Sequence, residues 1–309
     1  MLFNLKTPVL LIAFNRPDNT EKVFNRIRQA KPEKLYIAVD AARKDKKGEI
    51  EIVNEVIEIV KNVDWPCNVR YRFNESNLGA EITVSSAISW VFEEEDYAII
   101  LEDDIIAPIS FFEFMQEMLI KYKDEEIIGT VSGNNFTPIE TENNEDYFFA
   151  KYGHSWGWGT WKRAWKDFDL NIEIPDEHLK LSFFKKITNT RKEALHFKRI
   201  FKKMQNRGKG NSTWDFIYLY LHRIKGQLSI IPKVNLTSNI GIYGLHANGQ
   251  TKYHYQPFDE DFKVKKHPKK IKCFTKYDLY HFSNFITIRK SYVWRITLKI
   301  FRKLNIINN

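Results

Sequence analysis

The stretch "YAIILEDDIIAP" (residues 97–108) decides the fold of this 309-residue chain. Its uninterrupted apolar run, "AIIL", is typical of a β-strand covered on both faces, as the strands of a parallel sheet are. Glu102, Asp103 and Asp104 follow the run directly. Carboxylates so close together repel one another unless a cation or hydrogen-bond donors neutralise them. A buried strand that ends in this triplet therefore indicates a ligand site at the edge of a sheet.

The first 130 residues alternate short β-rich runs with amphipathic segments, which is the pattern of a mostly parallel α/β sheet flanked by helices. The expected strands are 8–14, 34–40, 68–74 and 97–104, and the expected helices are 21–30, 51–63 and 82–94. The first of these helices would be capped by Asp18 to Thr20. Ligands of open parallel sheets bind beyond the carboxyl ends of the strands. Asp40 and the acidic triplet should therefore converge on one rim.

The alternation stops after Asn135. Residues 151–165 hold four tryptophans and three glycines, and we predict a loop there. A basic helix is expected at 183–205, and a further helix capped by Ser212 or Thr213 should follow it. Short strands are expected within 227–241, and helices in the last 45 or so residues. Trp161 and Trp165 have helical spacing, which favours the core.

Charge and cysteine content exclude several classes of protein. The formal net charge is +9, yet residues 262–309 alone hold 13 Lys and Arg against one acidic residue, so the rest of the chain is slightly acidic. No recognised nucleic-acid-binding fold accompanies this basic tail, and we expect no nucleic-acid partner. Two distant cysteines fit a reducing compartment. Because no cleavage site follows the first apolar run and no apolar stretch approaches eighteen residues, a cytoplasmic protein is expected.

The triplet and Asp40 suit a hard divalent cation. Mg²⁺ and Mn²⁺ prefer one or two protein carboxylates together with phosphate oxygens that a substrate supplies. A solvated turn is the alternative for three acids in a row, but the buried strand before them and Asp40 on a neighbouring strand favour the metal. The sequence therefore predicts a Mn²⁺ or Mg²⁺ site that a phosphorylated ligand completes.

Four short segments carry a resemblance to known enzymes. "AFNRP" (13–17), "IAVD" (37–40), "LEDD" (101–104) and "SFFEF" (110–114) occur in that order. Together they resemble the nucleotide-sugar-binding half of GT-A glycosyltransferases, in which a D-x-D-like motif holds a metal on the nucleotide diphosphate. The chain resembles two groups of these enzymes over roughly residues 6–255. They are the N-acetylglucosaminyltransferase I family and the bacterial family 2-type transferases of surface polysaccharides, such as lipopolysaccharide.

The resemblance implies a role for each matching residue. Arg16 matches an arginine near the nucleotide, and Asp40 matches an aspartate that reads uracil. Asp103 matches a residue that contacts the sugar-nucleotide, and Asp104 matches the direct metal ligand. "TWDF" resembles a Trp-Asp pair whose aspartate is the catalytic base, which makes Asp215 the base. "YGLHANGQ" (243–250) resembles a stretch close to the diphosphate, where His246 replaces a usual serine and would bind either phosphate or metal. A family histidine has no counterpart, since Glu81 and Ile82 stand in its place.

Other candidate residues follow from position. Asn77 and Gly79 lie between a strand and a helix, where a helix N-terminus near the nucleotide or a plain turn are both plausible. Arg16, just after the first strand, suits a phosphate or base contact better than a solvated loop. Trp158, flanked by glycines, is expected with Trp214 in the acceptor site, since aromatic faces suit sugar rings. Asp215 could instead serve as a helix cap or first-turn acid.

The predicted function is an inverting, metal-dependent transfer of a sugar from a UDP-sugar to a hydroxyl of a glycan or lipid-linked saccharide, with N-acetylglucosamine as a weakly indicated donor sugar. Residues 1–135 would bind the nucleotide-sugar, 136–258 the acceptor, and 259–309 would form a basic aromatic tail. At 289–304 this tail has the pattern of a helix that either lies on an anionic bilayer, at the inner face of the plasma membrane, or packs on the body. Two rival functions stay open. One is a nucleotidyltransferase of sugar phosphates, although the Gly-rich first loop with a lysine that such enzymes normally have is missing. The other is a non-catalytic glycan- or membrane-binding module.

Overall fold

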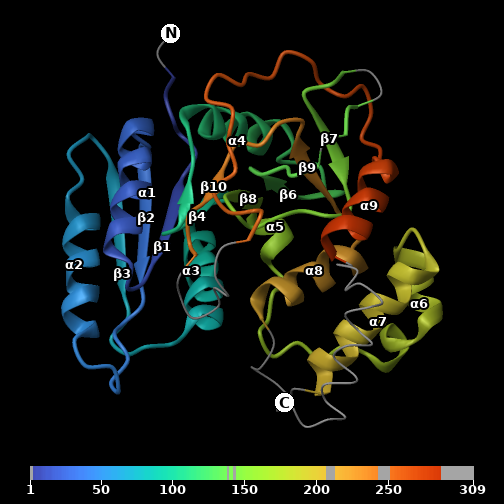
Figure 1. Cartoon of the computed structure of the whole chain (residues 1–309), viewed down its shortest axis with the longest axis horizontal. Coiled ribbons are helices and arrows are strands. Elements are labelled where there is room, and N and C mark those ends of the chain that lie inside the picture. Colours follow the sequence, from blue (N-terminus) through green and yellow to red (C-terminus); the bar gives the residue numbers. More distant parts are fainter. Residues whose placement is uncertain (1–2, 138, 142–143, 207–212, 243–250, 287–309) are drawn as a thin grey trace, which may run out of the picture.

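The protein is described from a computed structural model that covers residues 3–137, 139–141, 144–206, 213–242 and 251–286 (Figure 1). Within these ranges eight strands form one sheet in the order β3-β2-β1-β4-β8-β6-β9-β7. Its strands are β1 (Val9–Ala13), β2 (Lys34–Val39), β3 (Asn68–Phe73), β4 (Tyr97–Glu102), β6 (Ile128–Ser132), β7 (Tyr147–Ala150), β8 (Trp158–Trp161) and β9 (Leu228–Pro232). The first four strands pair in parallel, and β6 pairs in parallel with β9. The prediction of a mostly parallel α/β sheet flanked by helices is confirmed.

Helices cover both faces of this sheet. They are α1 (Pro17–Ala30), α2 (Glu49–Lys61), α3 (Ala80–Glu94), α4 (Ile109–Lys121), α5 (Lys162–Trp165), α6 (Leu181–Ile187), α7 (Arg191–Asn206), α8 (Trp214–Ile224) and α9 (Thr275–His281). A small second sheet pairs β5 (Ile105–Ile106) with β10 (Ser238–Asn239) just beyond β4. None of the helices in the described ranges is long and apolar enough to cross a membrane.

Alternate residues of the strands enter different cores, as the period of a β-strand requires. Val9 and Leu11 pack into a core with α1, α2 and α4, whereas Leu10 and Ile12 pack with α3 on the opposite face. The sheet is continuous across residue 135, because β4 pairs with β8 and β6 pairs with β9. The division into a nucleotide-sugar half and an acceptor half therefore lies within one sheet and stays a functional prediction.

The loop predicted at 151–165 is present at 151–157, but the prediction is wrong for 158–165, which form a central strand and a short helix. Residues Trp158–Trp161 form β8, which is antiparallel to both of its neighbours, β4 and β6. All four residues are buried, and Trp161 is in the core as expected. Gly159 fits a crowded place in this strand, because a Cβ there would lie 3.0 Å from a methyl group of Leu119 on α4 and 3.3 Å from the carbonyl oxygen of Ala98. Four residues with a central glycine give too short a pattern to be distinguished from a loop.

Helix boundaries differ from the predictions at two places. The N-cap of α1 is Arg16, with Pro17 at the first helical position, where its missing N–H costs nothing. The predicted caps Asp18 to Thr20 therefore lie inside the helix. The single basic helix expected at 183–205 is two helices, α6 and α7, because Thr188 and Thr190 bond to the flanking turns through their hydroxyls.

The C-terminal segment returns to the edge of the sheet after β10. Residues 259–274 run without a regular helix to β7, where the backbone N–H of Phe274 donates to the carbonyl of Phe149. Helix α9 follows, and residues Phe282–Ile286 continue it as a π-helical turn. The predicted membrane-associating helix at 289–304 lies outside the described residues.

Candidate active site

Three strand ends supply the first group of candidate residues. Arg16 follows β1, Asp40 follows β2, and Glu102 is the last residue of β4. Because β1 pairs in parallel with both β2 and β4, these ends lie at the same edge of the sheet. All three side chains line one cavity of about 390 Å³, here called the first cavity. The structure therefore brings Asp40 and the acidic triplet to one rim, as the sequence pattern indicated.

Arg16 neutralises part of the triplet. Its Nη1 donates to Asp104 Oδ2 at 2.8 Å, and its Nη2 pairs with Asp103 Oδ1. The second oxygen of Asp103 accepts the backbone N–H of Phe14 at 3.2 Å. Asp103 is almost fully buried, whereas the Asp104 side chain keeps 13% of its exposure. A protein cation thus supplies some of the neutralisation that the sequence suggested a metal would provide.

Glycine leaves room for the Asp104 carboxylate where the chain passes over this cluster at Gly241. A Cβ at this position would overlap the carboxylate of Asp104 and lie 2.9 Å from Arg16 Nη1. The Gly241 N–H donates to Asn239 Oδ1 at 2.7 Å, and the Ile240 N–H donates to the Asp104 carbonyl at 2.9 Å. The backbone after β10 is therefore tied to the residue whose side chain it covers.

The rim carries more negative than positive charge. Burial, together with the carboxylates of Asp104, Asp103 and Asp215, raises the pKa of Glu102 to about 8, although Arg16 opposes this. Burial also raises the pKa of Asp103 to about 6, although Arg16 opposes this. The carboxylates of Asp103 and Asp104 raise the pKa of Arg16 against the effect of its own burial, so this guanidinium stays charged.

The rim fits a divalent cation that a ligand helps to hold. Asp104 Oδ1 accepts no hydrogen bond from the described residues, and a carboxylate oxygen is a preferred ligand of Mg²⁺ and Mn²⁺. Within the described ranges no three His, Cys, Asp or Glu side chains gather closely enough to hold a metal alone. A cation on Asp104 would therefore take its remaining ligands from water and from phosphate oxygens, as Mg²⁺ commonly does.

Asp40 organises the loop before α3. It is buried, and five donors bond its two oxygens at 2.9–3.0 Å, from Ala41 N, Asn74 Nδ2, Asn77 Nδ2, Leu78 N and Gly79 N. These bonds fill the lone pairs of the carboxylate. Gly79 has a φ of +80° and precedes the first residue of α3. Asn77, Gly79 and the start of α3 are thus held at the first cavity by Asp40.

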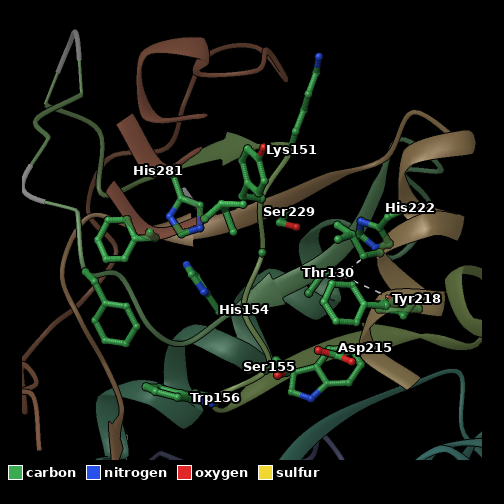
Figure 2. A pocket seen from close by; sticks show the side chains of 18 of the residues that line it. Thr130, Lys151, His154, Ser155, Trp156, Asp215, Tyr218, His222, Ser229 and His281 are labelled. Atoms are coloured by element: carbon green, nitrogen blue, oxygen red, sulfur yellow. Dashed lines mark hydrogen bonds between the residues drawn. The ribbon is translucent and has the colours of Figure 1, made fainter. Parts of the chain in front are cut away.

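A second cavity of about 400 Å³ adjoins the first, and Trp156 lines both (Figure 2). Asp215, in the first turn of α8, lines the second cavity. Its side chain is exposed there, with no hydrogen bond or ion pair to the described residues. Because the carboxylate of Asp215 also raises the pKa of Glu102, its charge acts on the first cavity.

Trp158 and Trp214 lie under this second cavity. Their rings stack with centroids 5.7 Å apart and planes at 18°. Trp158 is 2% exposed and packs against Trp165 and Tyr218, so its ring forms the floor of the cavity. Trp214 is half-buried and lies directly before Asp215. The acceptor-site role predicted for the two tryptophans stays a prediction, and Trp156 is more accessible than Trp158.

Three histidines of the second cavity are uncharged. Burial lowers the pKa of His154 to about 4, of His222 to about 3 and of His281 to about 2. His222 Nε2 shares a hydrogen bond of 2.8 Å with Thr130 Oγ1 (Figure 2). Sequence reasoning did not assign His281 or His222 to a site, because each lies in a helix with buried neighbours and resembles a core residue. His246 lies outside the described residues.

No family model and no curated protein matches this chain. Among solved structures, a mannosyltransferase from Pyrobaculum calidifontis in complex with GDP-Man and Mn²⁺ matches with 12% identity and a TM-score of 0.39, over 72% of this chain and 70% of that one. A UDP-glucose pyrophosphorylase complexed with UDP-glucose matches with 8% identity and a TM-score of 0.31, over 52% and 78%. HddC from Yersinia pseudotuberculosis matches with 12% identity and a TM-score of 0.32, over 52% and 80%. Likenesses this distant assign no activity to this chain.

Proposed function

We propose that the protein is an inverting, metal-dependent glycosyltransferase that moves a sugar from a UDP-sugar to a hydroxyl of a glycan or lipid-linked saccharide. One observation carries the proposal: two cavities share Trp156, and the first holds the Arg16–acid rim while the second holds Asp215, which has no partner among the described residues. Two adjoining cavities suit a reaction between two substrates. The order of the motifs, which resembles that of GT-A enzymes, supports the same function.

The first cavity would hold the donor. Arg16 has five N–H donors and would bind the diphosphate, since guanidinium groups suit phosphate oxygens. Asp104 would hold Mn²⁺ or Mg²⁺, which when bound stabilises negative charge on the departing diphosphate. Asp103 pairs with Arg16 and would hold it beside the sugar-nucleotide. Asp40 bonds Asn77 and Gly79 and would shape the base pocket through them.

The second cavity would hold the acceptor, with Asp215 as general base. The acceptor oxygen attacks the anomeric carbon while the bond from that carbon to the diphosphate oxygen breaks. The carboxylate of Asp215 takes the proton of the attacking hydroxyl, and UDP leaves with the electron pair of the broken bond. A single displacement of this kind inverts the anomeric centre. Asp215 can accept a proton because no described residue occupies its oxygens.

UDP release tests the proposal. Incubation with Mn²⁺ and a panel of UDP-sugars should release UDP slowly without an acceptor, and UDP with Mn²⁺ should raise the melting temperature. Asp215→Asn should lower transfer by about 10²–10⁴-fold, the usual contribution of a general base, while UDP and Mn²⁺ still raise the melting temperature. Asp176→Asn is the matched control, since Asp176 is another exposed first-turn acid that lines neither cavity.

The outcomes separate the proposal from its rivals. Absence of both UDP release and a metal-dependent shift with UDP would exclude the transferase. Release of pyrophosphate from UTP and a sugar phosphate would indicate a nucleotidyltransferase instead. Loss of UDP binding in Asp215→Asn would show that Asp215 supports the structure and is not the base.

A further inference from the structure

The wall of the second cavity opposite the α8 helix is built from aromatic rings of four distant segments. We call it the aromatic wall, and it consists of Phe136, Trp156, Tyr253 and Phe285. Phe136 has its ring centroid 5.4 Å from that of Tyr253, 5.7 Å from Trp156 and 6.2 Å from Phe285. Each of these side chains is half-buried and lines the cavity.

The rings of the aromatic wall cover one another in part. Tyr253 and Phe285 are 5.2 Å apart at 37°, and Phe136 meets Trp156 nearly edge to face at 73°. A sugar ring stacks best on one flat, open aromatic face and keeps its hydroxyls bonded, because a buried hydroxyl without a partner is costly. Apart from the buried hydroxyl of Tyr253, which has no hydrogen-bond partner in the described part of the chain, this wall presents an apolar surface, which Ile286 extends. It is therefore better suited to hydrocarbon than to a saccharide.

Besides the Tyr253 hydroxyl, a second polar group stands at the margin of the aromatic wall. His281 is 3% exposed, stacks on Phe285 at 4.8 Å, and its Nδ1 has no hydrogen-bond partner in the described part of the chain. A buried polar atom without a partner is unfavourable unless a ligand or water bonds it. Figure 2 shows His281 beside His154 at the side of the cavity away from Asp215. The cavity thus has an acidic end, a polar contact at His281 and an apolar wall.

We propose that the second cavity takes an acceptor sugar that carries an apolar aglycone, with the hydrocarbon lying on the aromatic wall. The proposal rests on the proposed function, since it assigns this cavity to the acceptor. The attacked hydroxyl lies at Asp215, and an oxygen near the aglycone bonds His281. Because Phe285 and His281 belong to the C-terminal segment, residues 275–286 select the acceptor while the strand ends of the first cavity select the donor.

Pairs of methyl and hexyl glycosides test this inference. The glycosides of glucose, galactose, mannose and N-acetylglucosamine would be titrated at concentrations below those at which they form micelles. Binding would be followed by tryptophan fluorescence, since Trp156, Trp158 and Trp214 line the cavity. For at least one sugar the hexyl glycoside should bind ten times more tightly or better, because burying two of its five additional methylenes suffices for about tenfold. Equal dissociation constants for every pair, or no binding, would overturn the proposal.

Variants of Phe285 test whether the preference for hexyl over methyl glycosides depends on the aromatic wall. Phe285→Ala should reduce the hexyl-to-methyl ratio to less than threefold, and Phe285→Leu should restore part of it. Leu279→Ala is the matched control, because Leu279 is an exposed apolar residue of the same helix that does not line the cavity. An undiminished ratio in Phe285→Ala would overturn the role of the aromatic wall.

The melting-temperature shift with UDP and Mn²⁺ checks the first cavity in every variant. Its persistence shows that the variants are folded. A hexyl preference in a protein that shows neither this shift nor UDP release would overturn the proposed transferase function and leave an apolar-glycoside site. A melting-temperature shift with UDP and Mn²⁺ but no preference for hexyl glycosides would overturn the acceptor inference and leave the proposed transferase function standing.

Discussion

Gly241→Ala should break the contact between Arg16 and Asp104 without touching the rest of the fold. The new methyl group would lie 2.8 Å from Asp104 Cγ and would overlap its carboxylate. The backbone cannot move away easily, because Ile240 N is bonded to the Asp104 carbonyl and Gly241 N to Asn239. The carboxylate must therefore rotate off Arg16. Gly241 is not among the residues with positive φ, so alanine adds no backbone strain of its own.

The cost of this change lies between two limits. Exposed ion pairs contribute about 0–1 kcal/mol, whereas removing one partner of a buried pair costs about 3–5 kcal/mol. Arg16 and Asp104 are 28% and 13% exposed, and Arg16 keeps Asp103 as a partner, so we expect a loss of about 1–3 kcal/mol in the free energy of unfolding. At about 2–4 °C per kcal/mol, the melting temperature should fall by several degrees.

Denaturant titration and a ligand shift measure the two consequences separately. Urea unfolding gives the free-energy loss, and the additional stabilisation by UDP and Mn²⁺ should disappear because Asp104 no longer points to the first cavity. The double variant Gly241→Ala/Asp104→Ala is the control: once the carboxylate is absent, alanine at 241 should cost less than about 0.5 kcal/mol. A Gly241→Ala protein with unchanged stability and an unchanged shift with UDP and Mn²⁺ would refute this reasoning.

Two further predictions concern buried polar groups. Asp40→Ala should lower the free energy of unfolding in urea by about 3 kcal/mol, because the amides of Asn74 and Asn77 lose a shared acceptor. Unchanged stability would contradict the role of Asp40 in holding the loop before α3. Stability should also fall as the pH drops below about 6.5, because His222 protonates in the unfolded chain but burial lowers its folded pKa to about 3. The stabilisation is present above pH 6.5 and is lost toward the folded pKa by up to about 1.4 kcal/mol per pH unit. His222→Gln should reduce that slope in unfolding measured at pH 7.5, 6 and 5, and an unchanged slope would argue against it.

The sequence predicted the first cavity because its signals are local. Apolar runs set the strands, and the residues directly after them, Arg16, Asp40 and the triplet, reach one edge once the strands are parallel. The parallel arrangement of the first strands could be predicted without long-range information, because strands and helices alternate along the first 130 residues. The same reasoning failed at β8, because a four-residue strand with a glycine is stabilised by its two neighbours and not by its own pattern.

The second cavity could not be predicted in the same way. Its aromatic wall joins residues 136, 156, 253 and 285, and no periodicity links positions so far apart. His281 has the sequence context of a core residue, and what distinguishes it is a buried Nδ1 beside a cavity without a hydrogen-bond partner among the described residues. Gly241 likewise has no local signal, since the atoms that exclude a side chain there belong to Asp104 and Arg16. Asp215 was found through a resemblance and not from its spacing.

The contact between Arg16 and the triplet explains how the chain tolerates three adjacent acids and would still bind the anionic donor of the proposed function. A guanidinium has five N–H donors, and the two carboxylates use one on each terminal nitrogen. No described residue accepts from its other three N–H groups, so in the proposed function Arg16 would bind diphosphate oxygens without releasing Asp103 or Asp104. We infer that the arginine serves the folded state and the donor at once: it lowers the repulsion within the triplet, and the negative charge that is left over is what a divalent cation would neutralise.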